Sequence, residues 1–223
     1  MRKIIVGAQV SIDGIMQSPG GPTEDPTKGF KFGGWSIAHF DDAAGEEIMS
    51  LFKDKFDLLL GRKTYEIFAA YWPYQDEKGP FGAIAKVFNS ITKYVVSRSG
   101  DVELSWNGTV LLRNIAAVQR LKKEDGPRLV TQGSTELVHA LLAKDLVDAI
   151  STFTVPVVLG KGKKLFEDGS APHEYKLTKS RVSGTGVLIG HYERAGDVKV
   201  DSSALGSPTE RELARRKRIK REG

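Results

Sequence analysis

The sequence contains no cysteine among its 223 residues. This absence excludes disulfides, thiolate nucleophiles, iron–sulfur clusters and zinc sites built from cysteine. There are four histidines, and none of them pairs with another at the spacing typical of a metal site. The H-E-x-x-H, G-x-S-x-G and Walker A patterns are also missing. We therefore expect no protein-bound metal, and we expect any catalysis to depend on a bound organic cofactor.

Long hydrophobic runs are missing as well. No stretch approaches the roughly 20 apolar residues that a membrane helix needs, and polar residues interrupt the apolar start of the chain from Gln9 onward. We therefore expect neither a membrane span nor a secretory leader, and we predict a cytoplasmic protein. With 40% hydrophobic residues, the chain is long enough to form one sizeable domain.

Positive charge is concentrated at the C-terminal end. The formal net charge is +5, and residues 207–223 hold seven arginines and lysines against three glutamates, so the rest of the chain is close to neutral. We interpret residues 1–196 as one folded domain and residues 197–223 as a basic, solvated and partly helical tail. Nucleic-acid binding is therefore not expected of the folded part, and a contact of the tail with RNA, DNA or an anionic surface is the alternative.

Strand-like and helix-like segments alternate along most of the chain, which predicts an α/β fold with helices on both faces of a mostly parallel sheet. Apolar and β-branched runs predict strands at 3–10, 57–61, 94–97, 109–112, 128–131 and 149–158. Helical spacing predicts helices at 41–56, 63–71, 81–89, 115–124 and 135–143. Segments 175–183 and 186–194 flank a glycine-rich turn and predict a final antiparallel hairpin.

A long glycine- and proline-rich segment, residues 17–37, separates the first strand from the first helix. It contains Phe30, Phe32 and Trp35, although its composition forbids regular structure. Loops of this length inside a domain are often lids or binding loops. We expect its aromatic residues either to stack on a substrate or to anchor the loop to the core.

The segment Gly61-Arg62-Lys63-Thr64 joins a predicted strand directly to a predicted helix. Free backbone N–H groups at a helix N-terminus, together with two cations, suit a phosphate group such as the 2′-phosphate of NADPH. The alternative is that the glycine turn and the basic residues only start a helix and bind no ligand.

A second strand-to-helix junction, Gly133-Ser134-Thr135, offers backbone and hydroxyl donors that suit a pyrophosphate. It is not a Rossmann fingerprint, because G-x-G-x-x-G is missing. A third segment, Ser97-Arg98, ends another predicted strand and suits the adenosine end of the same cofactor, although it also fits a solvated strand end.

Five motifs occur in a fixed order along the chain. They are Val10-Ser11-Ile12-Asp13-Gly14, Gly61-Arg62-Lys63-Thr64-Tyr65-Glu66, Val96-Ser97-Arg98, Gln132-Gly133-Ser134 and residues 155–166. This set resembles the dihydrofolate-reductase-like superfamily. Over roughly residues 2–195 the chain is most similar to the C-terminal reductase domain of bifunctional riboflavin-biosynthesis deaminase-reductases and to its stand-alone relatives.

The resemblance implies a three-layer fold with an eight-stranded, mostly parallel sheet, and NADPH bound across the C-terminal ends of the strands. It implies that homologous positions hold the cofactor, namely Ala8, Gly61, Arg62, Lys63, Thr64, Ser97, Arg98, Gly133, Ser134, Thr135, Gly160 and Gly162. Relatives often pair, so a homodimer is expected by analogy.

The resulting prediction is an NADPH-dependent reductase that transfers a hydride to a small planar heterocycle, resembling 5-amino-6-(5-phosphoribosylamino)uracil reductase. Asp13 is predicted as a polar substrate anchor or proton relay, with Glu47 as the second choice; a turn-capping Asp13 and a surface Glu47 are the structural alternatives. Riboflavin reductases usually have lysine where this chain has Ile15, so a phosphorylated substrate is doubtful. The alternative functions are a dihydrofolate or pterin reductase and a non-catalytic nucleotide-binding or interaction protein.

Overall fold

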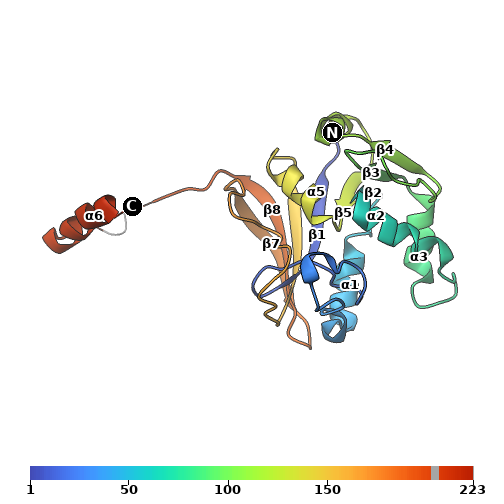
Figure 1. Cartoon of the computed structure of the whole chain (residues 1–223), viewed down its shortest axis with the longest axis horizontal. Helices are drawn as coiled ribbons and strands as arrows, with labels where there is room; N and C mark the ends of the chain where they lie inside the picture. The colour runs from blue at the N-terminus through green and yellow to red at the C-terminus, as the bar shows by residue number, and fades with distance from the viewer. Residues whose placement is uncertain (202–205, 223) are drawn as a thin grey trace.

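The molecule is organised around one sheet of eight strands, in a computed structural model that describes residues 1–201 and 206–222 (Figure 1). The strands are β1 (Ile4–Ser11), β2 (Phe56–Gly61), β3 (Lys93–Val96), β4 (Thr109–Leu112), β5 (Arg128–Thr131), β6 (Ala149–Val155), β7 (Glu174–Val182) and β8 (Leu188–Gly196). Their order across the sheet is β4-β3-β2-β5-β1-β6-β8-β7.

The pairing confirms the predicted mixture of parallel and antiparallel strands. Every contact from β4 across to β6 is parallel. The two pairings at the end of the sheet are antiparallel: β8 pairs with β6, and β7 pairs with β8. The C-terminal ends of six parallel strands therefore meet at one edge of the sheet, which is where ligands bind in open α/β sheets.

Helices cover both faces of this sheet, so the predicted three-layer arrangement is confirmed (Figure 1). They are α1 (Asp42–Ser50), α2 (Arg62–Ala69), α3 (Gly82–Ser90), α4 (Ile115–Lys123) and α5 (Thr135–Leu142), with short 3-10 helices at Thr27–Gly29, Ile37–His39 and Trp72–Tyr74. In strand β2, successive side chains point to opposite faces of the sheet. Leu59 packs with α4 and α5, whereas Leu58 and Leu60 pack with α1, α2 and α3. All three leucines are fully buried.

Two predicted boundaries were wrong for identifiable reasons. The first helix ends at Ser50 instead of continuing to Phe56, which begins β2. The Phe52 and Phe56 rings still pack 5.1 Å apart, so the helical spacing of these residues reflects a shared core and not a shared helix. Strand β6 ends at Val155 because Pro156 has no N–H to continue the ladder.

The C-terminal region forms α6 (Glu210–Glu222), which lies apart from the sheet in Figure 1. Its ion pairs are internal, with Glu212 bound to Arg215 and Arg216. Residues 202–205, part of the predicted tail, lie outside the described residues. In the described part of the chain, no helix is long and apolar enough to cross a membrane.

Candidate functional site

A cavity of about 1830 Å³ opens at the C-terminal edge of the parallel strands. Its lining includes the residues that follow β2, β3 and β5, the middle of β1, and the inner sides of α1, α2 and α3. The cavity therefore occupies the position that the topology predicts for a ligand.

The two predicted phosphate-binding junctions touch each other. The backbone N–H of Gly61, at the end of β2, donates to the carbonyl oxygen of Gly133 at 3.1 Å. A Cβ atom at Gly133, where φ is +143°, would lie 2.7 Å from Thr64 Oγ1, and a Cβ atom at Gly61 would clash with Ser134 Oγ. The peptide bond between Gly133 and Ser134 is cis. Close approach of the two backbones therefore requires glycine at both positions.

Both helices that begin at these junctions lack a side-chain cap. Gly61 has no side chain to cap α2, and Ser134 makes no side-chain bond to the first turn of α5. In α1, by contrast, Asp41 accepts a hydrogen bond from the Ala44 N–H at 2.9 Å. The first-turn N–H groups of α2 and α5 are thus left to bind an anion, which the helix dipoles also favour.

Cations surround this end of the cavity. Arg62 donates to Glu66 at 2.8 Å, a contact that uses one of its five N–H donors. Within residues 1–201 and 206–222, no carboxylate pairs with Lys63 or Arg98, and both line the cavity. Two unpaired cations beside two uncapped helix N-termini form a strongly anion-attracting site.

Two interlocked loops border the cavity at its other end, beside β1. The Met16 N–H donates to the carbonyl oxygen of Lys163 at 2.8 Å, and the Lys163 N–H donates to Gln17 Oε1 at 3.0 Å. The Lys163 ammonium also pairs with Asp25 at 2.5 Å. The loop after β1 and the loop after β6 therefore form one connected wall.

Asp13 belongs to this loop connection and lies outside the cavity lining. Its carboxylate accepts hydrogen bonds from Ser11 Oγ at 2.6 Å and from the N–H groups of Leu159 and Gly160 at 3.1 and 2.7 Å. Burial raises the pKa of Asp13, but these three donors outweigh it and hold the pKa below its ordinary value. The group is therefore an ionised acceptor at neutral pH.

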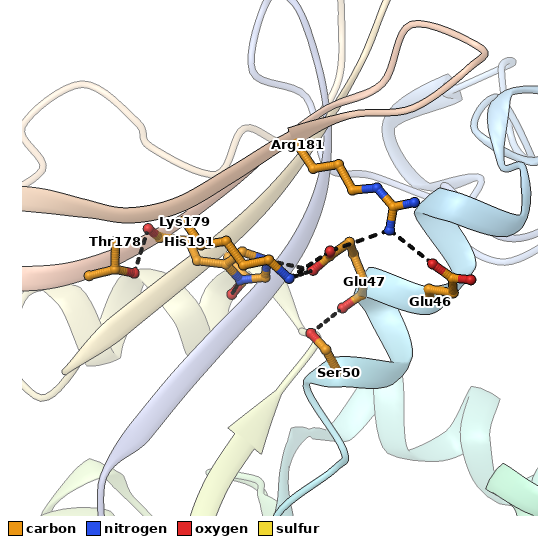
Figure 2. Close-up of polar contacts among 8 residues, drawn as sticks. Glu46, Glu47, Ser50, Thr178, Lys179, Arg181 and His191 are labelled. Atoms are coloured by element: carbon orange, nitrogen blue, oxygen red, sulfur yellow. Dashed lines mark hydrogen bonds and ion pairs between the residues drawn. The ribbon is translucent and has the colours of Figure 1, made fainter.

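Glu47 is also outside the lining, because its side chain points from α1 toward the final hairpin (Figure 2). Lys179 Nζ donates to both of its carboxylate oxygens at 2.7 Å, and His191 Nε2 lies 3.2 Å away. Arg181 bridges Glu47 to Glu46, which does line the cavity. Burial raises the pKa of Glu47, but Lys179 and His191 together lower it below its usual range.

The structure brings most of the predicted cofactor residues together. Ten of them line the one cavity: Ala8, Gly61, Arg62, Lys63, Thr64, Ser97, Arg98, Gly133, Ser134 and Thr135. Gly160 and Gly162 do not line it; Gly160 binds Asp13, and Gly162 packs against Ile15, where a Cβ atom would approach within 2.6 Å. For all twelve residues, the role in binding the cofactor stays a prediction.

Sequence reasoning missed several residues that line the cavity. Gln9 is a polar side chain within the apolar run of β1, and Ser36 Oγ donates to its Oε1 at 2.5 Å. That polar interruption is a signal that could have identified it. Phe52, Phe68 and Phe88 line an aromatic branch of the cavity beside α1, α2 and α3. The sequence offers no signal that distinguishes them from ordinary core residues.

Comparison with known proteins agrees with this architecture. The family profile described as RibD C-terminal domain matches residues 2–189. The uncharacterized protein YyaP of Bacillus subtilis is 28% identical over 193 residues, which covers 84% of this chain and 92% of YyaP.

Two solved structures share the fold. A pyrimidine reductase-like protein from Corynebacterium diphtheriae superposes with a TM-score of 0.57 at 14% identity, over 88% of this chain and 93% of its own. Dihydrofolate reductase from Enterococcus faecalis, complexed with NADP(H), superposes with a TM-score of 0.54 at 13% identity, over 86% and 96% of the two chains. The predicted dihydrofolate-reductase-like fold is therefore confirmed.

Proposed function

The chain belongs to the RibD C-terminal domain family, and on that premise we propose that it is an NADPH-dependent reductase acting on a small planar heterocycle. The observation that supports this most directly is the contact between the Gly61 and Gly133 junctions. It brings two uncapped helix N-termini together in the lining of a single cavity. Lys63 and Arg98, which pair with no carboxylate among the described residues, line the same cavity. Such a site fits the phosphate groups of a dinucleotide.

Different residues at the phosphate end are assigned to the 2′-phosphate and to the pyrophosphate of NADPH. In the proposal, Arg62, Lys63 and Thr64 hold the 2′-phosphate, and Arg98 closes the opposite wall together with the turn at Ser97. The first turn of α5 holds the pyrophosphate through its N–H groups. The E. faecalis dihydrofolate reductase, which has the same fold, was solved with NADP(H).

Bound NADPH would supply the hydride, so the protein needs mainly to orient the reactants and exclude water. Ala8, on β1, lines the cavity between the phosphate end and the loop wall, and is 2% exposed. The interlocked loops after β1 and β6 restrict solvent on that side. The catalytic roles of Asp13 and Glu47 stay predictions, as do homodimerisation and cytoplasmic location.

The test is cofactor binding followed by turnover. NADPH fluorescence should change on titration with the protein, with clearly weaker binding of NADH. NADPH oxidation should then be followed with pterin, pyrimidine and quinone-like acceptors. Oxidation with a pterin alone would favour the folate-type alternative, and binding without oxidation would favour a nucleotide-binding module. Failure to bind either cofactor would refute the proposal.

A further inference from the structure

We propose that the substrate of this cavity carries no phosphate, and that it is a neutral or cationic planar molecule with an apolar arm. This inference rests on the proposed reductase function and specifies its substrate class. It is carried by the distribution of charge along the cavity and by the aromatic branch between the helices.

The strand order places the cations of the phosphate end apart from most of the carboxylates that line the cavity. The exceptions are Glu136, in the first turn of α5, and Glu167, which pairs with His139 of α5 at 2.9 Å. The cations of the phosphate end follow β3 and β2, which lie on one side of β5. On the other side of β5 lie β1, β6 and β8, and the cavity there is bordered by the loop after β1 and by the N-terminal half of α1. That half of the lining contains five carboxylates: Glu24, Asp25, Asp41, Asp42 and Glu46.

Lys163 is the one lysine or arginine that lines this acidic half among the described residues. It does not offer a free charge, because it pairs with Asp25 at 2.5 Å and both side chains are largely buried. Asp42 is exposed, and within the described residues it has no ion-pair partner. Glu46, like Asp25, is paired, with Arg181 of β7 at 2.9 Å. A phosphate placed here would still face Glu24, Asp41 and Asp42, and no unpaired lysine or arginine among the described residues lines this half.

The N-terminus of α1 does not compensate for this. A helix N-terminus attracts anions only while its N–H groups and dipole are free. Asp41 already accepts the Ala44 N–H, a side-chain cap that α2 and α5 lack. Asp41 and Asp42 together place two carboxylates at this helix start, whereas α5 has one, Glu136. The phosphate-binding design of α2 and α5 is therefore not repeated at α1.

The apolar part of the lining that a substituent could contact is the aromatic branch, formed by Phe52, Phe68, Trp72 and Phe88. Phe88 contacts Phe52 and Trp72 edge-on, with ring centroids 5.0 Å apart in both cases, and stacks on Phe68 at 6.1 Å. All four rings line the cavity. A ribosyl phosphate buried against these rings would lose its hydration without gaining a hydrogen bond from them, whereas an apolar arm gains from burial.

The experiment compares two ligands that share one ring. The full chain, saturated with NADP⁺, is titrated calorimetrically with 5-amino-6-(benzylamino)uracil and with 5-amino-6-(5-phosphoribosylamino)uracil. The benzyl compound is expected to bind at least tenfold more tightly. Equal or tighter binding of the phosphorylated compound, or no binding of the benzyl compound, would overturn the inference.

A charge reversal provides the second measurement. Asp42→Lys should shift the affinity ratio at least fivefold toward the phosphorylated ligand, whereas Glu193→Lys, on the exposed part of β8, should leave the ratio unchanged. An unchanged ratio in Asp42→Lys would contradict the electrostatic argument. Failure of the unmodified chain to bind NADPH or NADP⁺ would refute the proposed function itself. Tighter binding of the phosphorylated ligand by the chain saturated with NADP⁺ would refute only this inference.

Discussion

The Gly61 N–H and the Gly133 carbonyl oxygen are 3.1 Å apart, so the starts of α2 and α5 are joined by a direct backbone hydrogen bond. The two segments are far apart in the sequence, and each alone would be an ordinary helix start. Their contact gives the cavity one end with two sets of free N–H groups. The two segments predicted from the sequence to bind phosphate groups therefore lie side by side in the fold.

Gly133→Ala tests this contact directly. The new Cβ atom would lie 2.7 Å from Thr64 Oγ1, on a backbone with φ of +143°. We expect a loss of about 1–3 kcal/mol in the free energy of unfolding, measured by urea denaturation, together with weaker NADPH binding. Gly45→Ala is the control for stability. Gly45 lies within α1, and a Cβ atom added there meets nothing within 4 Å. This variant should therefore gain about 0.5–1 kcal/mol in the free energy of unfolding.

Arg62→Ala should weaken NADPH binding by about 1–3 kcal/mol and leave NADH almost unchanged, because the lost charge-assisted hydrogen bond serves only the 2′-phosphate. Fluorescence titration with both cofactors measures the difference. Arg120→Ala, which removes an exposed arginine of α4 outside the cavity lining, should affect neither. Equal losses for NADPH and NADH in Arg62→Ala would argue against the assigned role.

Asp13→Asn separates a proton relay from a loop connection. Asparagine keeps one acceptor oxygen, so one of the bonds to Leu159 or Gly160 is lost. We expect a raised KM for the acceptor substrate and a loss of about 1–2 kcal/mol in the free energy of unfolding. The pH profile of kcat should stay unchanged. A shifted pH profile would instead support the relay predicted from the sequence.

Glu47→Gln should destabilise the fold at pH 7 by about 1–3 kcal/mol, because it removes charge-assisted hydrogen bonds to Lys179 and His191. The pKa of Glu47 is lower in the folded chain than its ordinary value of 4.5. Its contribution is therefore present above pH 4.5 and is lost as the pH falls through the folded-state pKa.

Urea denaturation between pH 3 and pH 7 measures this dependence. The difference between the unmodified protein and Glu47→Gln should shrink steadily below pH 4.5. Glu193→Gln changes an exposed carboxylate and should match the unmodified protein throughout. A difference that stayed constant down to pH 3 would show that the ionised form of Glu47 does not stabilise the fold.

The sequence supported some parts of the site better than others. The phosphate end was predictable because its residues follow each other locally, as strand, glycine, cation and helix. The acidic half was not, since Asp41 and Asp42 look like ordinary helix caps and Glu24 lies in an irregular loop. Glu47 was misleading because α1 presents Glu46 and Glu47 in different directions, and the packing of the hairpin decides which one is buried.

Local periodicity was sufficient for the alternating strands and helices, the antiparallel end of the sheet and the glycines of the two junctions. It could not say that β5 lies between β2 and β1, because strand order depends on pairings between residues distant in the chain. That order places Gly133 beside Gly61 and sets the cations that follow β2 and β3 apart from the carboxylates at the start of α1. A short segment can encode its own backbone and burial pattern, but its neighbours in space are chosen only when the whole sheet assembles.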